Sequence, residues 1–118
     1  MDVDQEKVAQ FLREFKALIS TGRDFDFIGR PENNSVFINL GLTWRNFIRE
    51  LLGLSVVDYC SGPENDRDRP GVVWLFGKEI YGHDIYIKLK IYDLGSQRKA
   101  KCISFHEANH PIRYPFRK

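Results

Sequence analysis

The chain has 118 residues, of which 42% are hydrophobic and 14% aromatic, and these proportions are typical of a single globular domain. Its formal net charge of +2 does not by itself argue for a nucleic-acid partner, and no apolar run approaches the roughly 20 residues of a membrane span. Two cysteines, Cys60 and Cys102, are too few for a disulfide framework and lack the spacing of a zinc site, so we expect reduced thiols and no zinc.

The first predicted element is a helix over residues 4–20. Its apolar residues recur at helical spacing, with Asp4 as the expected N-cap and Gly22 just beyond the end. The polar, acidic residues 1–7 are unlike a secretory signal, which favours a cytoplasmic protein with no membrane partner. Residues 23–28 then alternate phenylalanine with charge, which indicates a short edge strand or an extended segment.

Three more short helical segments are expected between residues 31 and 59. Pro31 suits the first turn of a helix over about residues 32–40. Thr43 is the expected N-cap of the next helix. The apolar face of that helix is formed by Trp44, Phe47, Ile48, Leu51 and Leu52. Ser55 and Asp58 have the spacing of a capping box, which predicts one last helical turn.

Residues 61–70, Ser-Gly-Pro-Glu-Asn-Asp-Arg-Asp-Arg-Pro, have the composition of a loop and no periodicity. A polar loop that leads into a rigid sheet is often functional, which makes Arg67 and Arg69 candidate binding residues. The alternative is a solvated connection in which the two arginines pair with Asp66 and Asp68.

The stretch from Gly71 to Ala108 predicts three antiparallel strands, at about residues 72–76, 85–92 and 100–106. Both connections contain glycine, which accommodates the positive φ of hairpin turns. The middle strand directs Ile85, Ile87, Leu89 and Ile91 to one face, and Tyr86, Lys88, Lys90 and Tyr92 to the other. One packed and one solvated face are typical of an antiparallel sheet. Trp44 and Trp74 are expected in the core.

Together these elements predict one α+β domain that spans the whole chain. It consists of a helical part (4–59), an antiparallel sheet (71–107) and an extended C-terminal strap (109–118). His106 ends the last strand, near the solvated face. His83 lies in a turn and His110 in the tail, and both are expected to be ordinary surface residues.

Short segments follow one another in a fixed order between residues 40 and 107. They are Leu40-Gly41-Leu42, Leu51-Leu52-Gly53-Leu54-Ser55, Asp58-Tyr59, Val73-Trp74, Gly82, Tyr86-Ile87-Lys88 and Ile103-Ser104-Phe105. In order and spacing they resemble the MqsR family of bacterial toxins. The N-terminal helix and the C-terminal tail are only loosely similar to that family.

This resemblance implies a RelE-like fold, in which N-terminal helices pack on a twisted antiparallel sheet. It also implies a toxin of a type II toxin–antitoxin pair. Such a toxin is a metal-independent endoribonuclease that cuts messenger RNA and is neutralised by a protein antitoxin. The resemblance leaves dependence on the ribosome open, so the ribosome is a partner that we do not require.

Four positions of the family pattern can be followed in this chain. Tyr86 matches the family's sheet tyrosine, and His106 stands where the family has a catalytic lysine. Ser61 replaces a lysine and Leu75 replaces a glutamine. The lost charge has candidate substitutes in Lys78, Lys88 and the two loop arginines.

Ribonuclease chemistry at these residues needs no cofactor, because RNA supplies its 2′-hydroxyl as the nucleophile. The enzyme needs a base, an acid and cations for the charged transition state. An unperturbed imidazole has a pKa of about 6.5, which suits His106 as the proton shuttle. Tyr86 orients the phosphate or protonates it, or stacks a base, while Lys88 contributes charge. The expected RNA-binding residues are Lys78, Lys90, Arg67, Arg69 and Tyr92.

Other interpretations of the same residues stay open. A histidine at a strand end is often structural, and tyrosines that alternate with lysines often form only a solvated face. Cys102 has the same parity as His106 and would be a candidate nucleophile, but it lacks a third orienting group. Ser61 and Leu75 favour the alternative of a non-catalytic RNA- or protein-binding domain on the same scaffold.

Overall fold

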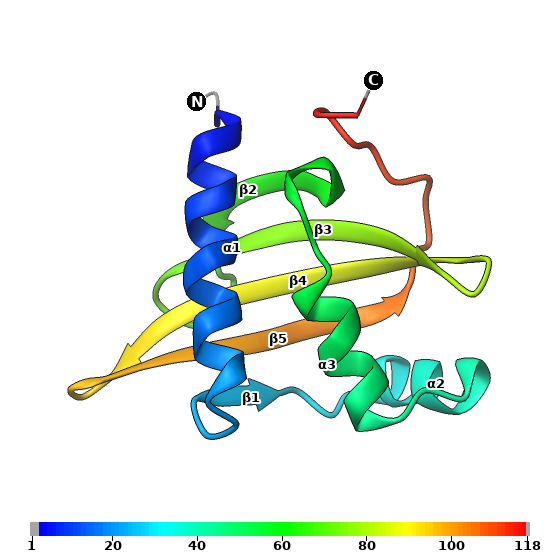
Figure 1. Ribbon diagram of the computed structural model, residues 1–118, viewed down its shortest axis with the longest axis horizontal. Coiled ribbons are helices and arrows are strands. Elements are labelled where there is room, and N and C mark those ends of the chain that lie inside the picture. The colour runs from blue at the N-terminus through cyan, green and yellow to red at the C-terminus, as the bar shows by residue number, and fades with distance from the viewer. Residues whose placement is uncertain (1–2, 118) are drawn as a thin grey trace.

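The computed structural model describes residues 3–117, in which three α-helices and one 3-10 turn pack with a five-stranded sheet (Figure 1). The helices are α1 (Gln5–Ser20), α2 (Pro31–Leu40) and α3 (Trp44–Leu52), and the turn is η1 (Val56–Asp58). The strands are β1 (Phe25–Phe27), β2 (Tyr59–Asn65), β3 (Val72–Ile80), β4 (His83–Leu94) and β5 (Gln97–Glu107). The predicted α+β class is confirmed. Residues 1, 2 and 118, which belong to the predicted domain and strap, lie outside the described residues.

The sheet has the strand order β1-β5-β4-β3-β2. Strands β2 to β5 form an antiparallel meander, which confirms the predicted pairing of the segments after Gly71. Strand β1 pairs in parallel with β5, so the sheet is mixed rather than purely antiparallel. Parallel strands need a long connection between them, and the chain between β1 and β5 provides it, since it includes α2, α3 and three strands.

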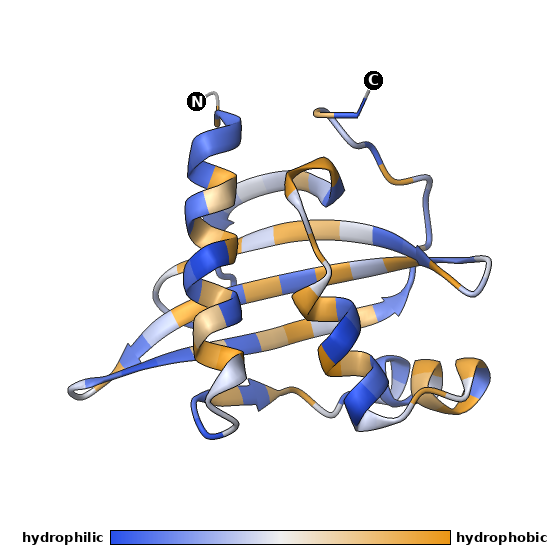
Figure 2. Cartoon of the chain, in the orientation of Figure 1, coloured by the Kyte–Doolittle hydropathy of each residue, from blue (hydrophilic) through white to orange (hydrophobic). Residues whose placement is uncertain are grey.

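Helices α1 and α3 cover one face of this sheet (Figure 1). Strand β4 alternates between hydrophobic and hydrophilic residues along its length (Figure 2). Its apolar residues Ile85, Ile87 and Leu89 are fully buried beneath the helices, as the period of two predicts. The core is completed by aromatic side chains from both layers, namely Phe11, Phe15, Phe47, Phe76 and Phe105.

The predicted helix ends are confirmed by their hydrogen bonds. The Asp4 carboxylate accepts from the backbone N–H of Lys7 at 2.9 Å. Thr43 and Asn46 form a reciprocal capping box at the start of α3. Gly41 ends α2 in the left-handed conformation, at φ 65°.

Trp44 is not a core residue, contrary to the prediction. It is the first residue of α3 and remains 53% exposed, with its ring at the rim of the aromatic cluster. Its helical spacing fits the apolar face, and the rings of Phe25 and Phe27 lie 6.0 Å from it between centroids, but much of its side chain stays exposed at the start of the helix. Trp74 is partly buried and stacks on Phe11, with ring centroids 4.8 Å apart.

The prediction of a loop over residues 61–70 is wrong for its first half. Residues 61–65 continue β2, and only residues 66–71 connect it to β3. Strand β2 lies at the sheet edge and pairs with β3 through two register shifts. An edge strand tolerates glycine and proline because one side of its backbone needs no strand partner.

Asn33 of α2 extends the sheet edge beyond the short strand β1. Its side-chain amide donates to the carbonyls of Ile28 and Ile103, at 2.8 and 2.9 Å. Its side-chain oxygen accepts from the backbone N–H of Phe105 at 3.0 Å. The amide therefore satisfies edge groups of β5 that would otherwise be buried without partners, and it fixes the end of the strand that carries His106.

Candidate active site

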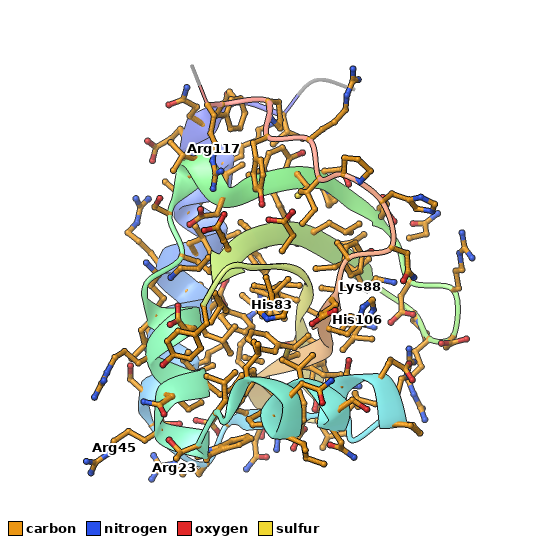
Figure 3. The ribbon with its side chains drawn as sticks, turned by 90° about the vertical axis from the view of Figure 1, so that its right-hand side faces the viewer. Arg23, Arg45, His83, Lys88, His106 and Arg117 are labelled. Carbon is orange, nitrogen blue, oxygen red and sulfur yellow. The ribbon has the colours of Figure 1, made fainter. Side chains whose placement is uncertain are left out.

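The sheet face opposite α1 and α3 is called here the open face. It carries Leu75 and Gly77 from β3, Tyr86, Lys88, Lys90 and Tyr92 from β4, and Ser104 and His106 from β5. Tyr86 and His106 are directly paired across β4 and β5, and their rings stack with centroids 5.3 Å apart. Lys88 is the next residue of β4 on this face, and Figure 3 shows it on the same side of the molecule as His106. The structure thus brings the three predicted catalytic residues together.

The hydrogen bond of His106 selects its tautomer. Nδ1 lies 2.9 Å from the backbone carbonyl oxygen of Glu107. A carbonyl oxygen only accepts, so Nδ1 carries the proton in the neutral ring. The lone pair is then on Nε2, which makes this nitrogen the one able to accept a proton from a substrate.

Tyr86 is half-buried, and burial raises the pKa of its hydroxyl above the ordinary value. The negative charge of Glu64 raises this pKa further, whereas the positive charge of Arg67 lowers it. The phenol is therefore protonated at neutral pH and able to donate a hydrogen bond. Arg67 was predicted as a binding residue, but Glu64 was not, because its place on the irregular edge strand could not be inferred from spacing.

A β-bulge at Ile103 separates Cys102 from His106. Cys102 is paired with Leu89 on the helix-covered face, and His106 is paired with Tyr86 on the open face. The expected common face of the two residues is therefore wrong, because the inserted residue reverses the parity. Burial also raises the pKa of the Cys102 thiol, and it raises that of Cys60 to about 11. Both thiols are free, and neither is activated as a nucleophile.

The C-terminal strap, residues 109–117, forms no helix or strand, has a turn at residues 115–116 and crosses the open face. It lies directly on Gly77, where an added Cβ would come within 2.7 Å of both Ile112 Cδ1 and Tyr114 Oη. At its end the ring of Phe116 stacks on Tyr59 with centroids 5.3 Å apart. The Arg117 guanidinium donates to Asp58 Oδ1 at 3.0 Å.

A cavity of about 510 Å³ lies between this strap and the sheet. Its sheet wall includes Ser61, Tyr86 and His106, and its strap wall includes Ile112 and Arg113. His110, predicted as an ordinary surface residue, is exposed but also lines this cavity. The cavity has the size of a small-molecule site and contains two of the predicted catalytic side chains.

Lys90 does not present a charge to solvent, contrary to the expectation for the polar face of β4. It is only 2% exposed, and its ammonium group donates to Asp66 Oδ2 at 2.5 Å and to the Pro70 carbonyl at 2.8 Å. The connection 66–71 folds over this lysine, and no local pattern in β4 indicates that cover. Lys90 is a structural residue that holds the connection against the sheet.

The arginines of this connection do not pair with the neighbouring acids as the solvated alternative supposed. Asp66 pairs with Lys90, and Asp68 lies 3.8 Å from Arg30. Arg67 lines a small polar cavity of about 220 Å³ with Lys88. Arg69 is exposed on the connection.

Two predicted RNA-binding residues lie away from the pair of Tyr86 and His106. Lys78 points to the helix-covered face and forms an ion pair with Glu50 at 2.9 Å. Tyr92 is on the open face, but six residues along β4 from Tyr86, or about 20 Å at 3.3 Å per residue. Its hydroxyl donates to Asp26 at 2.5 Å, and burial raises its pKa to about 12. These two positions are therefore not part of the candidate site.

His83 Nδ1 lies 2.8 Å from Glu107 Oε1, within hydrogen-bond distance, at the turn end of β4. The strap residues of the cavity, Asn109, Ile112 and Arg113, were missed by sequence reasoning. Their only signal was the content of proline, aromatic and basic residues in the tail, which indicated an extended segment but not its destination.

Comparisons with known proteins identify no relative: no family model, no curated protein and no solved structure matches the chain. Within residues 3–117, no helix is both long enough and apolar enough to cross a membrane. What the chain does is therefore inferred from the side chains of the open face and from the resemblance in sequence.

Proposed function

We propose that this chain is a metal-independent endoribonuclease of the MqsR type, with a RelE-like fold. In this proposal it cleaves messenger RNA in the cytoplasm and is neutralised by a cognate protein antitoxin. The observation that carries the proposal is the stacked pair of Tyr86 and His106 at the wall of an open cavity, with Lys88 next to it on the same face.

The reaction is an attack by the 2′-oxygen of a ribose on the adjacent phosphorus. Nε2 of His106 takes the proton of the 2′-hydroxyl while the new oxygen–phosphorus bond forms. The bond from phosphorus to the 5′-oxygen breaks, and Tyr86 gives the leaving oxygen its proton. The products are a 2′,3′-cyclic phosphate and a 5′-hydroxyl end. Water is not consumed in this step, and proton transfer from the protonated His106 to the phenolate restores both residues.

Positive charge near the phosphate stabilises the transition state. Lys88 is half-buried on the open face, opposite Leu75 on one neighbouring strand and Ser104 on the other. Arg67 shares the small polar cavity with Lys88 and is close enough to lower the pKa of Tyr86. Ser61 stands where the family has a lysine, and Lys88 and Arg67 are the candidates to supply the positive charge that is missing at that position.

The cross-strand register supports the resemblance on which the proposal is based. Ser61 is paired with Leu75, Leu75 with Lys88, and Tyr86 with His106. The four positions that match functional positions of the family therefore share one face of adjacent strands.

The test is cleavage of a plain RNA by the purified chain in the presence of EDTA, with and without ribosomes. We expect cleavage with EDTA present, and cyclic phosphate at the new 3′ ends. Binding of RNA without cleavage under both conditions would overturn the proposal. It would favour a non-catalytic binding domain, in agreement with the uncharged Ser61 and Leu75.

A further inference from the structure

The cavity under the C-terminal strap has two unlike walls. The sheet side includes the rings of Tyr86 and His106, which stack on each other, and the strap side includes the aliphatic side chain of Ile112. We infer that this cavity binds one nucleobase of the RNA substrate. The inference rests on the proposed function, and it assigns to the strap a role in choosing the cleavage sequence.

The dimensions and lining of the cavity fit a planar, polar-edged ligand. Its volume of about 510 Å³ lies within the range of about 300–1,000 Å³ for small-molecule sites. Single-stranded RNA is recognised by bases that stack on aromatic side chains while their edges form hydrogen bonds. The Ser61 hydroxyl and the Asn109 amide lie in the lining and are able to read such an edge. Arg113, exposed on the strap, is placed to meet a phosphate of the same nucleotide.

The cavity exists before any ligand arrives because the strap is attached on both sides of it. On one side β5 leads directly into the strap, and the Ala108 N–H donates to the Asp84 carbonyl at 2.9 Å. On the other side Ile112 and Tyr114 rest on Gly77, and Arg117 binds Asp58. Because the strap is already in position, ligand binding has a smaller entropic cost of ordering this segment.

The experiment titrates the full chain with the four nucleoside 3′-monophosphates and with ribose 5-phosphate, and follows protein NMR signals. We expect the best nucleotide to bind at least about 10-fold tighter than ribose 5-phosphate, since base stacking contributes on this scale. The shifted signals should include the rings of Tyr86 and His106 and the methyl groups of Ile112. Ile112→Ala should reduce the preference among bases about five-fold by removing apolar contact surface from the strap wall. The matched control is Ile38→Ala, at a side chain that is 81% exposed on α2, and it should change nothing.

Equal affinity for all five ligands would overturn the inference, as would shifts confined to the neighbouring cavity of Arg30, Glu64 and Lys88. The wild-type titration decides this point even if a variant fails to fold. Failure of the proposed function has a different result. A chain that discriminates among bases but cuts no RNA would keep the nucleobase site and lose the ribonuclease, whereas one that cuts RNA without discrimination would lose only the site.

Discussion

His106 has a defined ring orientation and one ring nitrogen available to a ligand, as the proposed proton transfer requires. Its ring is stacked on Tyr86 and its Nδ1 is bonded to the Glu107 carbonyl, so the orientation of the ring is defined. Its Nε2 has no hydrogen-bond partner among residues 3–117, and the ring lines the cavity. The free nitrogen therefore supports a chemical role.

Replacing His106 tests this role directly. His106→Ala should lower the cleavage rate by about 10²–10⁴-fold, the usual contribution of a general base. His106→Lys should retain partial activity, because an ammonium stabilises charge but is a poor base at a reference pKa of about 10.4. Tyr86→Phe should cost less than alanine at His106. The measurement is single-turnover cleavage of an RNA oligonucleotide.

The melting temperature of each variant is the control, because a side chain at the solvent-accessible end of a strand supports little of the core. RNA binding should persist in all three variants, since Lys88 and the arginines of the connection remain, and the largest loss is expected for His106→Ala, which removes one ring of the proposed nucleobase site. Wild-type cleavage by His106→Ala, with an unchanged melt, would make this histidine merely structural.

The buried pair of Lys90 and Asp66 gives a prediction for stability. The hydrogen bond from Lys90 holds the pKa of the Asp66 carboxyl below its ordinary value, against the opposing effect of burial. The charged form is thus favoured in the folded state, and its contribution is present above the unfolded pKa of about 3.9. Asp66→Asn should lower the free energy of unfolding by about 2–4 kcal/mol at pH 7. The difference from wild type should shrink as the pH falls below about 3.9.

Urea unfolding at several pH values measures this difference. Asp68→Asn is the matched control, because Asp68 is exposed and its ion pair with Arg30 should contribute less than about 1 kcal/mol. A penalty for Asp66→Asn that stays constant from pH 7 to pH 3 would show that the charge of Asp66 does not stabilise the fold.

At the scale of elements, the contact between β3 and the strap shapes the candidate site. Gly77 is buried under Ile112 and Tyr114, and its missing side chain is what lets the strap lie flat on the sheet. The edge strand β2 adds Ser61 to the same surface, and the bulge in β5 turns His106 toward it. The site is therefore assembled by β2, β3, β4, β5 and the strap together.

Gly77→Ala should displace the strap, because a Cβ there would lie 2.7 Å from Ile112 Cδ1. We expect a loss of about 1–3 kcal/mol in the free energy of unfolding, which is typical of overpacking. The selectivity of RNA cleavage should also fall while some cleavage remains. Thermal unfolding and cleavage-site mapping measure the two effects.

Gly29→Ala provides the comparison, since the nearest atoms to its added Cβ are those of the Asn34 side chain, at an ordinary 3.8 Å. That variant should be close to wild type in both measurements. If Gly77→Ala is equally close to wild type, the strap does not depend on the contact at Gly77.

In the whole molecule the two faces of the sheet have different roles (Figure 1). Helices α1 and α3 bury one face and supply the core, while the other face carries the candidate active site beneath a thin strap. A partner protein that covers the open face would block both the paired rings and the cavity.

Expression of the wild-type chain alone should therefore arrest bacterial growth, and a small protein encoded beside it should relieve the arrest. The basis is the family resemblance, with loss of messenger RNA as the cause. Growth curves and RNA levels after induction measure the effect. His106→Ala, expressed to the same level, should be harmless. Normal growth with abundant, folded wild-type protein would contradict the prediction.

The local pattern of the sequence determined the elements themselves. Contacts between residues two to four positions apart produce the helical and alternating periods, the caps at Asp4 and Thr43, and the shared face of Tyr86 and Lys88. These depend on near neighbours, so they could be predicted from the printed chain.

The tertiary structure alone decided what covers each face. Lys90 is buried because the connection of residues 66–71 folds over it. Lys78 forms an ion pair with Glu50 of α3. One inserted residue at Ile103 reversed the parity of Cys102 and His106. Burial and register depend on segments far away in sequence, and no short period encodes them. For that reason the candidate catalytic residues could be chosen from the sequence, whereas the cavity beside them became visible only when the strap was in place.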